Sequence, residues 1–312
     1  MIDRYLKMTA VAPTNPPNAR SLRKFEAGNL MEWVASVVLQ RAGILIAKQT
    51  WIKYEYPGLF PVTGRLDFLA GGVPDWDEAE KSIKELAQLG LPSIFAKLGR
   101  NLVDHFKNTY QVGQLFGKEL KEIVIEIKSC SAFMYEYYDR LGTANDNHVL
   151  QSYHYLKSLS KDEAHIVYIS KDDLRILEFG VFNPSRVEDL YRKDIETITL
   201  HVRNRVQPPL EKEIEFRPET GRFYDNWKVK YSGYLTMLYG YADQMEYENK
   251  YKPLTAKYNR VFKRCVLGQN MTAMNFEVID QLKTDFPDFD KLVADTKASG
   301  VLEKETAEEA EL

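Results

Sequence analysis

The sequence predicts an α/β fold in which a sheet of about five strands is flanked by helices. Short runs rich in β-branched residues alternate with longer segments that carry helix-start and helix-stop residues, which is typical of a sheet packed between helices. Hydrophobic residues make up 44% of the 312 residues, enough for one large core or two smaller ones.

Residues 1–20 are predicted to be an irregular lead-in, because Pro and Asn are frequent there and no apolar run is long enough for a signal peptide or a membrane span. We therefore expect no membrane partner and a cytoplasmic location. Cys130 and Cys265 are too few for a Cys-rich zinc site or a disulfide framework, which fits a reducing compartment.

Negative charge is concentrated at the C-terminus. The formal net charge is −3, and the last ten residues alone hold five Glu and one Lys. Residues 301–312 are therefore predicted to be a disordered acidic tail. Bulk charge neither indicates nor excludes nucleic-acid binding, so any basic surface has to be local.

The first long helix is predicted over residues 21–43, with Ser21 as N-cap and Gly43 as C-cap. Apolar residues lie almost all round it, which predicts packing on more than one side. Glu32 stands on the narrow polar strip, one turn after Gly28. Two readings stay open from this helix alone: a solvent-facing Glu, or a carboxylate that reaches a buried site.

A hairpin is predicted from residues 50–56 and 62–70, joined by a Pro- and Gly-containing turn. Asp67 interrupts the apolar end of its second strand and shares a face with Arg65, although Asp is disfavoured inside strands. Asp67 either bonds a local amide or acts as a ligand at the end of the sheet. Residues 73–120 then read as a helical insertion at the edge of the sheet.

The segment from Glu122 to Lys128 reads as an interior strand of aliphatic residues. Glu126 and Lys128 project from one face of it, since side chains alternate along a strand. An isolated Glu-x-Lys of this kind is most often an ordinary ion pair on a half-solvated strand.

Residues 129–147 are predicted to be a loop whose tyrosines either pack the loop down or stack on bases. A helix over 145–160 places Gln151 and Tyr155 on one face, with His148 within reach. Strands 164–170 and 174–182 complete the sheet, and a helix over 184–206 ends the core of residues 21–206. Residues 207–300 are expected to form a mostly helical C-terminal region packed on that core.

Four short motifs follow one another in the chain: Gly28 to Glu32 matches G-x-x-x-[E/H], Gly64 to Asp67 matches G-x-x-D, Glu126 to Lys128 matches E-x-K, and Gln151 to Tyr155 matches Q-x-x-x-Y. In this order, each on the expected element, they resemble the RecB-like exonuclease branch of the PD-(D/E)XK nuclease superfamily. That branch includes phage recombination exonucleases and CRISPR-associated exonucleases. The resemblance implies a restriction-endonuclease-like core with a mixed central sheet.

The resemblance also implies roles for individual residues. Asp67, Glu126 and Lys128 would be catalytic. Mg²⁺ or Mn²⁺ would be the cofactor, since oxygen ligands without thiolate suit hard cations. Its ligands would be Glu32, Asp67, Glu126 and the Ile127 backbone carbonyl. Substrate would be bound by Gln151, Tyr155, Arg65 and His148.

Some members of this branch carry an iron–sulfur cluster on cysteines in a W-x-C-x-Y-C motif. The segment from Trp227 to Tyr234 is similar to that motif, but Val229 and Ser232 stand where the cysteines would be. The resemblance therefore implies a relative without an iron–sulfur cluster.

The function implied is a metal-dependent DNA exonuclease acting on single strands or on an end of double-stranded DNA, in recombination, repair or phage replication. Two alternatives stay open: a site- or structure-specific endonuclease on the same fold, and an inactive nuclease-fold protein that binds DNA. No protein partner is indicated.

Overall fold

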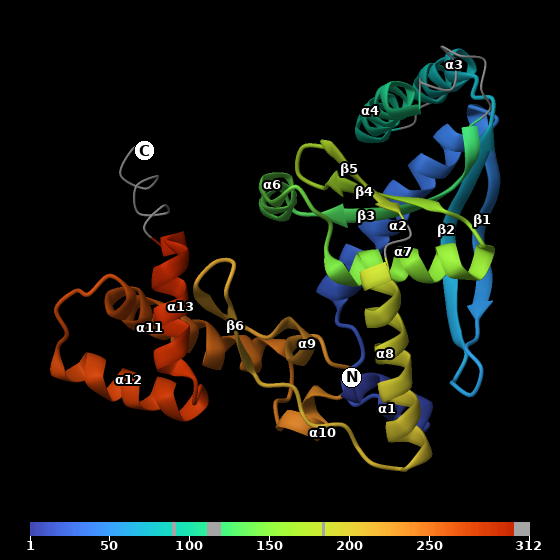
Figure 1. Ribbon diagram of the computed structural model, residues 1–312. Helices are drawn as coiled ribbons and strands as arrows, with labels where there is room; N and C mark the ends of the chain where they lie inside the picture. The colour runs from blue at the N-terminus through green and yellow to red at the C-terminus, as the bar shows by residue number, and fades with distance from the viewer. Residues whose placement is uncertain (89–91, 111–119, 183–184, 303–312) are drawn as a thin grey trace. The chain divides into compact units, whose positions relative to one another are not determined.

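The computed structural model describes residues 1–88, 92–110, 120–182 and 185–302. The α/β prediction is confirmed: a five-stranded mixed sheet of order β1-β2-β3-β4-β5 is flanked by helices (Figure 1). The strands β3 and β4 pair in parallel, and the other neighbours pair antiparallel. The strands are Leu45–Tyr54 (β1), Val62–Gly72 (β2), Leu120–Cys130 (β3), Glu163–Ser170 (β4) and Ile176–Phe182 (β5).

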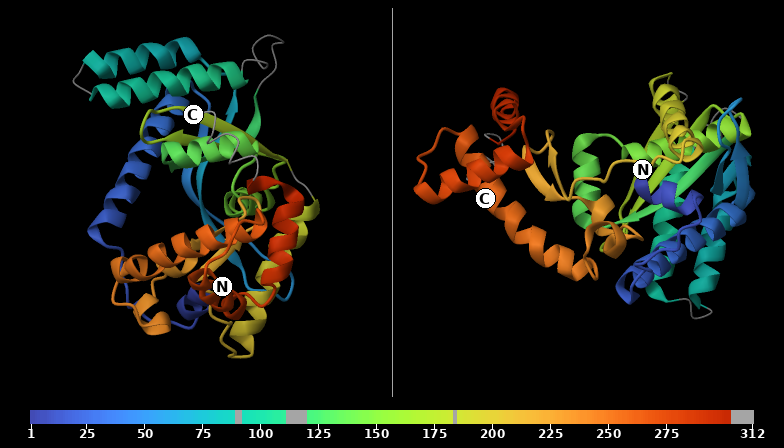
Figure 2. Two further views of the ribbon diagram at one scale, coloured as in Figure 1. Left: turned by 90° about the vertical axis from the view of Figure 1, so that its left-hand side faces the viewer. Right: turned by 90° about the horizontal axis from the view of Figure 1, so that it is seen from below.

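Helices cover both faces of this sheet (Figures 1 and 2). One face, which carries Phe68 and Ile125, packs against α2, and the other, which carries Leu66 and Val124, packs against α7. The helices of this part are Ala19–Arg41 (α2), Trp76–Gln88 (α3), Ser93–Tyr110 (α4), Ala132–Leu141 (α6), Asp146–Leu159 (α7) and Ser185–Arg203 (α8). The parallel strands β3 and β4 need a crossover, which α6 and α7 provide.

Three predictions about the first long helix and the first strand are wrong. The helix α2 starts earlier than expected, because the side chain of Asn18 accepts the Ser21 N–H at 2.9 Å and takes the N-cap position assigned to Ser21. Its apolar residues are also not packed all round, since Phe25 and Trp33 are exposed. The first strand begins at Leu45 rather than at residue 50.

The predicted loop at 129–147 contains a helix, α6. Ser131 caps its start by accepting the Met134 N–H, and Gly142 ends it in the left-handed conformation at φ +64°. The side chains of Tyr135 and Tyr138 are buried. These two tyrosines therefore pack the segment down, which was one of the two readings of this aromatic run.

The chain divides into two compact units, one of residues 18–200 and one that joins residues 1–17 to the chain from residue 201 onward. The prediction of an irregular lead-in is wrong, because Ile2–Met8 form the helix α1 and bury Ile2, Tyr5 and Leu6. The Met1 amino group pairs with Glu211 at 3.1 Å, which ties the N-terminus to the C-terminal part of the sequence.

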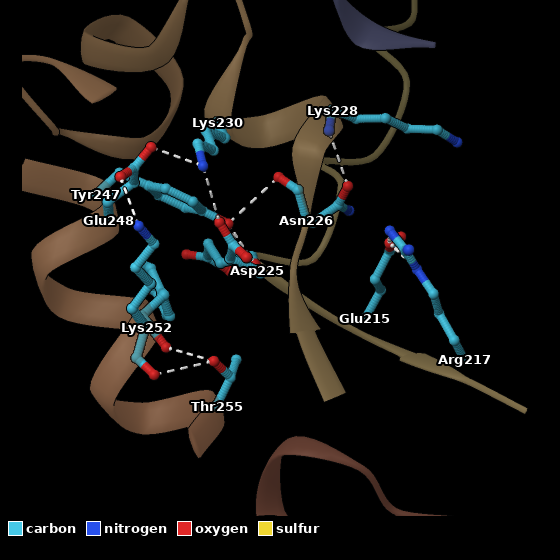
Figure 3. Close-up of polar contacts among 12 residues, drawn as sticks. Glu215, Arg217, Asp225, Asn226, Lys228, Lys230, Tyr247, Glu248, Lys252 and Thr255 are labelled. Atoms are coloured by element: carbon cyan, nitrogen blue, oxygen red, sulfur yellow. Dashed lines mark hydrogen bonds and ion pairs between the residues drawn. The ribbon is translucent and has the colours of Figure 1, made fainter. Parts of the chain in front are cut away.

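The second unit is mostly helical, as predicted, and adds a small hairpin that was not predicted. Lys230 joins its elements by pairing with Asp225 at 3.3 Å and with Glu248 at 2.6 Å (Figure 3). Its elements are Ile214–Arg217 (β6), Arg222–Asp225 (β7), Trp227–Lys230 (α9), Leu235–Tyr239 (α10), Gln244–Val266 (α11), Ala273–Asp285 (α12) and Phe289–Ser299 (α13). Most of the predicted acidic tail lies outside the described residues.

In the part of the chain that the structure describes, no helix combines the length and the apolar character that crossing a membrane requires.

The predicted insertion is fixed to the sheet by a buried polar cluster centred on Glu178 of β5. Its carboxylate contacts His105 of α4 at 2.5 Å, Tyr110 of α4 at 3.1 Å and His165 of β4. The second ring nitrogen of His165 faces Glu163 at 2.8 Å. Because both nitrogens face carboxylates, the ring is held as a doubly protonated cation.

The ionisation of this cluster follows from its contacts. Burial acts to raise the pKa of Glu178, but the hydrogen bonds and charges of His105 and His165 outweigh it and lower this pKa to about 2. Burial acts to lower the pKa of His165, but the hydrogen bond and charge of Glu178 outweigh it and raise this pKa.

We predict that the stabilisation from this cluster depends on pH. Glu178 has a lowered pKa, so its contribution is complete above the ordinary Glu value of 4.5 and is lost as pH falls toward about 2. His165 has a raised pKa, so its contribution is complete below 6.5 and is lost as pH rises through the raised value. Glu178→Gln is therefore expected to destabilise the protein most between these two limits.

Urea unfolding of the wild type and Glu178→Gln at about pH 3, about pH 5.5 and about pH 8.5 tests this expectation. The exposed substitution Glu55→Gln is the control. A stability difference that is equal at all three pH values would contradict it.

Candidate active site

Strand register places three polar residues in one row across the sheet. Phe68 pairs with Ile125, which sets Asp67 of β2 opposite Glu126 of β3. On the other side of β2, Lys48 and Thr50 pair with Phe68 and Leu66, which sets Gln49 of β1 opposite Asp67. The row Gln49, Asp67, Glu126 is therefore a consequence of backbone pairing.

Asp67 and Glu126 form a buried carboxyl pair. Their side chains are 9% and 0% exposed. Asp67 Oδ2 accepts the Ile127 N–H at 3.0 Å, whereas Oε2 of Glu126 is buried without any hydrogen-bond donor. Burial, with a smaller contribution from Asp67, raises the pKa of Glu126 to about 8 against the lowering effect of the Lys128 charge. Burial also raises the pKa of Asp67, against the lowering effect of Lys128.

Lys128 supplies positive charge to this pair. Its ammonium pairs with Oε1 of Glu126, and 24% of its side chain is exposed. The E-x-K segment thus contains the Glu–Lys ion pair that is the most common interpretation of such a motif. It differs from an ordinary surface pair because the Glu126 carboxyl is fully buried.

Glu32 of α2 joins the site from a different element. Burial, with the neighbouring Asp67, raises its pKa to about 7 against the lowering effects of Arg65 and Lys128. The amide nitrogen of Gln49 donates a hydrogen bond to Oε1 of Glu32. Of the two readings of Glu32, the structure supports the carboxylate that reaches a buried site.

Gly28 lets α2 approach the end of β3 closely. A Cβ at Gly28 would lie 3.3 Å from Oγ of Ser129, the residue after Lys128. Since Glu32 lies one helical turn further along α2, this close approach brings its carboxylate toward the strand end.

Tyr155 of α7 supports β2, the strand that carries Asp67. Its hydroxyl donates to the Arg65 carbonyl at 3.0 Å and accepts from the Gln151 amide at 2.5 Å. Tyr155 is fully buried. Its hydroxyl links Gln151 of α7 to the backbone of β2. The predicted substrate contacts of Gln151 and Tyr155 stay predictions.

Gly64 permits this packing, because a Cβ there would lie 2.9 Å from the ring of His154 and 3.1 Å from that of Tyr155. Under 3.0 Å a neighbour has to move. The first residue of the G-x-x-D segment is thus needed for close contact between β2 and α7.

His148 lies near Lys128, with Nδ1 2.7 Å from the hydroxyl of Tyr168. Burial, together with the positive charge of Lys128, lowers its pKa to about 4. His148 is therefore neutral at neutral pH, and its predicted substrate contact stays a prediction.

The side chains of the site offer oxygen ligands to a metal ion. No group of three or more His, Cys, Asp or Glu side chains within the described ranges has the arrangement of a metal site. The facing carboxyls of Asp67 and Glu126 nevertheless fit a hard cation, because Oε2 of Glu126 is buried without a donor and both groups offer only oxygen. Two buried carboxyls need either a shared proton or a cation between them.

The C-terminal unit shows how the Trp227–Tyr234 segment is held. Val229 is buried in the apolar core, and Oγ of Ser232 donates to Asp3 at 2.8 Å. The helix α11 borders a cavity of about 710 Å³. The cavity is lined by Lys212, Lys250 and Lys257 and also by three carboxylates, Glu213, Glu277 and Asp285. The charges of this cavity are therefore mixed.

Sequence reasoning missed Gln49. It read residues before 50 as lying outside the first strand, and a lone Gln carries no periodic signal. The position follows only from the register of the β1–β2 hairpin, which sets Gln49 opposite Asp67.

The sequence matches no model of a protein family, and no characterised protein is similar enough to count as a relative. Among solved structures, the crystal structure of SSO0001 is 15% identical, with 68% of this chain and 69% of that chain covered and a TM-score of 0.36. This likeness supports no inference about function.

We predict that substitution by Ala destabilises the protein at Gly64 but not at Gly28. Gly64→Ala forces a Cβ against buried ring atoms and is expected to lower the free energy of unfolding by about 1–3 kcal/mol. Gly28→Ala meets only a hydroxyl at 3.3 Å and gains up to about 1 kcal/mol of helix propensity, so its net effect is expected to be small.

Urea unfolding of both variants beside the wild type measures the two effects. A Gly28→Ala variant that loses as much stability as Gly64→Ala would contradict this account of the packing.

Proposed function

We propose that this chain is a metal-dependent nuclease that hydrolyses phosphodiester bonds of DNA. The observation that carries the proposal is the buried Asp67–Glu126 carboxyl pair with Lys128 beside it. A fully buried Glu without a donor on one oxygen is unfavourable in a purely structural role. It becomes favourable when a cation binds there.

Asp67 and Glu126 would hold the cation directly, with Glu32 and the Ile127 carbonyl as further oxygen ligands. Bound Mg²⁺ or Mn²⁺ supplies Lewis acidity and lowers the pKa of a water molecule that it coordinates. The protein's own contribution is a site held by strand register and largely closed to solvent, which strengthens every charge interaction inside it.

Lys128 would act on the substrate. Its side chain is the partly exposed member of the site. A compact ammonium can donate to a phosphate oxygen or to the attacking water and offset the negative charge that develops on the phosphate. The exposed Arg65 adds a second cation near Glu32 that can contact the DNA backbone.

The substrate class rests on the ordered motifs together with this arrangement. We propose exonuclease action on single-stranded DNA or on a duplex end, in recombination, repair or phage replication. A DNA substrate and two free cysteines, Cys130 and Cys265, fit a cytoplasmic protein.

Loss of the negative charge of Asp67 or of the positive charge of Lys128 is expected to lower the rate of DNA hydrolysis strongly. Asp67→Asn should abolish hydrolysis that depends on Mg²⁺ or Mn²⁺. Lys128→Ala should slow it on the order of 10²–10³-fold, the usual effect of removing one donor to a transition-state charge. Lys53→Ala, which removes an exposed lysine from β1, is the matched control and should retain full activity.

The measurement is digestion of end-labelled single- and double-stranded linear DNA and of closed circular DNA, with Mg²⁺, with Mn²⁺ and with EDTA. Cleavage of closed circles would make the protein an endonuclease. Full activity in purified Asp67→Asn, or activity that survives EDTA, would refute the site; DNA binding without any cleavage by the wild type would favour an inactive DNA-binding protein.

A further inference from the structure

Gln49 has an unusual backbone for a strand residue. It lies within β1, yet its φ is +51°, in the left-handed region that side chains with a Cβ rarely adopt. The other non-glycine residues with positive φ in the described chain, Ala10, Ser160, Leu174 and Arg205, all lie in turns or loops. A residue with a strained backbone inside a strand persists only where other contacts hold it.

The contacts that hold Gln49 are with the candidate site. Its amide nitrogen donates to Oε1 of Glu32, and its position in the sheet is opposite Asp67. One side chain from β1 thus contacts a carboxylate on α2 and stands opposite a carboxylate on β2.

Repulsion between the carboxylates of Glu32 and Asp67 explains why the hydrogen bond from Gln49 to Glu32 matters. Glu32 accepts a hydrogen bond from Gln49, and Asp67 lies opposite Gln49 in the sheet, so the two carboxylates flank the same side chain. Without a donor between them, two carboxylates on separate elements move apart. An amide N–H directed at Glu32 favours the orientation in which both carboxylates face the same space.

We propose that Gln49 is a positioning residue that orients Glu32 toward Asp67, so that carboxylates from α2 and β2 act as one ligand set for a divalent cation. This inference rests on the proposed function, because it assigns Gln49 to the metal site of that nuclease. Gln49 itself does not contact the reacting atoms.

The test exploits the backbone strain. Gln49→Gly removes the amide and also relieves the positive φ, so the metal-free variant is expected to unfold at the same urea concentration as the wild type or a higher one. Its affinity for Mn²⁺, measured by electron paramagnetic resonance titration, is expected to fall about tenfold, at the lower end of the usual effect of losing a residue that orients a ligand. A merely structural Gln49 predicts unchanged Mn²⁺ affinity.

A double-mutant cycle tests whether Gln49 affects Mn²⁺ affinity through Glu32. In a Glu32→Ala background, Gln49→Gly is expected to change Mn²⁺ affinity less than twofold, because the ligand that Gln49 orients is already gone. Gln40→Ala, an exposed Gln on α2, is the control and should match the wild type.

Three results would overturn the inference: Mn²⁺ affinity of Gln49→Gly within twofold of the wild type, a loss of affinity equal in both backgrounds, or a wild type that binds no Mn²⁺. The last result would also refute the proposed function. Wild-type protein that binds Mn²⁺ but does not hydrolyse DNA would refute the proposed function alone, and the affinities would still decide the role of Gln49.

Discussion

The burial of two carboxyl groups at facing positions of neighbouring strands is the constraint on which the rest of the site depends. Asp67 and Glu126 are brought together by the β2–β3 register, which the aliphatic residues around them fix through the core. A shift of one residue in that register would turn the aliphatic side chains away from the core, so the pairing is strongly specified. The stability of the sheet therefore maintains an arrangement that is electrostatically unfavourable in isolation.

Helices on both faces of the sheet position the residues around the Asp67–Glu126 pair. On one face, α2 brings Glu32 to Asp67 by way of Gly28, and on the other, α7 fixes β2 through the hydroxyl of Tyr155. Each contact depends on a small residue or on a single hydrogen bond. The polar residues of the site are thus held by elements whose own stability comes from apolar packing, which is how a site keeps its geometry under charge repulsion.

Much of this arrangement was predictable from local patterns. Aliphatic runs and turn residues locate the five strands to within a few residues, with the start of β1 as the main error, and the chain order of Glu32, Asp67, Glu126 and Lys128 anticipates which residues meet. What failed depended on long-range contacts. The helix α1 forms because its apolar side packs within a unit completed by residues two hundred positions later, and no local signal marks that partner.

The roles of individual side chains were harder to predict than their places. Gln151 and Tyr155 share a helix face, as expected, but only the structure reveals that Gln151 donates to Tyr155 and that Tyr155 donates to the backbone of β2. Gln49 escaped notice because its importance comes from strand register and from an unusual φ, and neither is encoded in a short motif.

The central claim is that a divalent cation binds between Asp67 and Glu126. Anomalous diffraction from crystals soaked in Mn²⁺ tests it most directly, because manganese is located independently of any assay of activity. The account predicts an anomalous peak within coordination distance of a carboxyl oxygen of each residue. A crystal that takes up manganese elsewhere and shows no peak between these two carboxyl groups would contradict it.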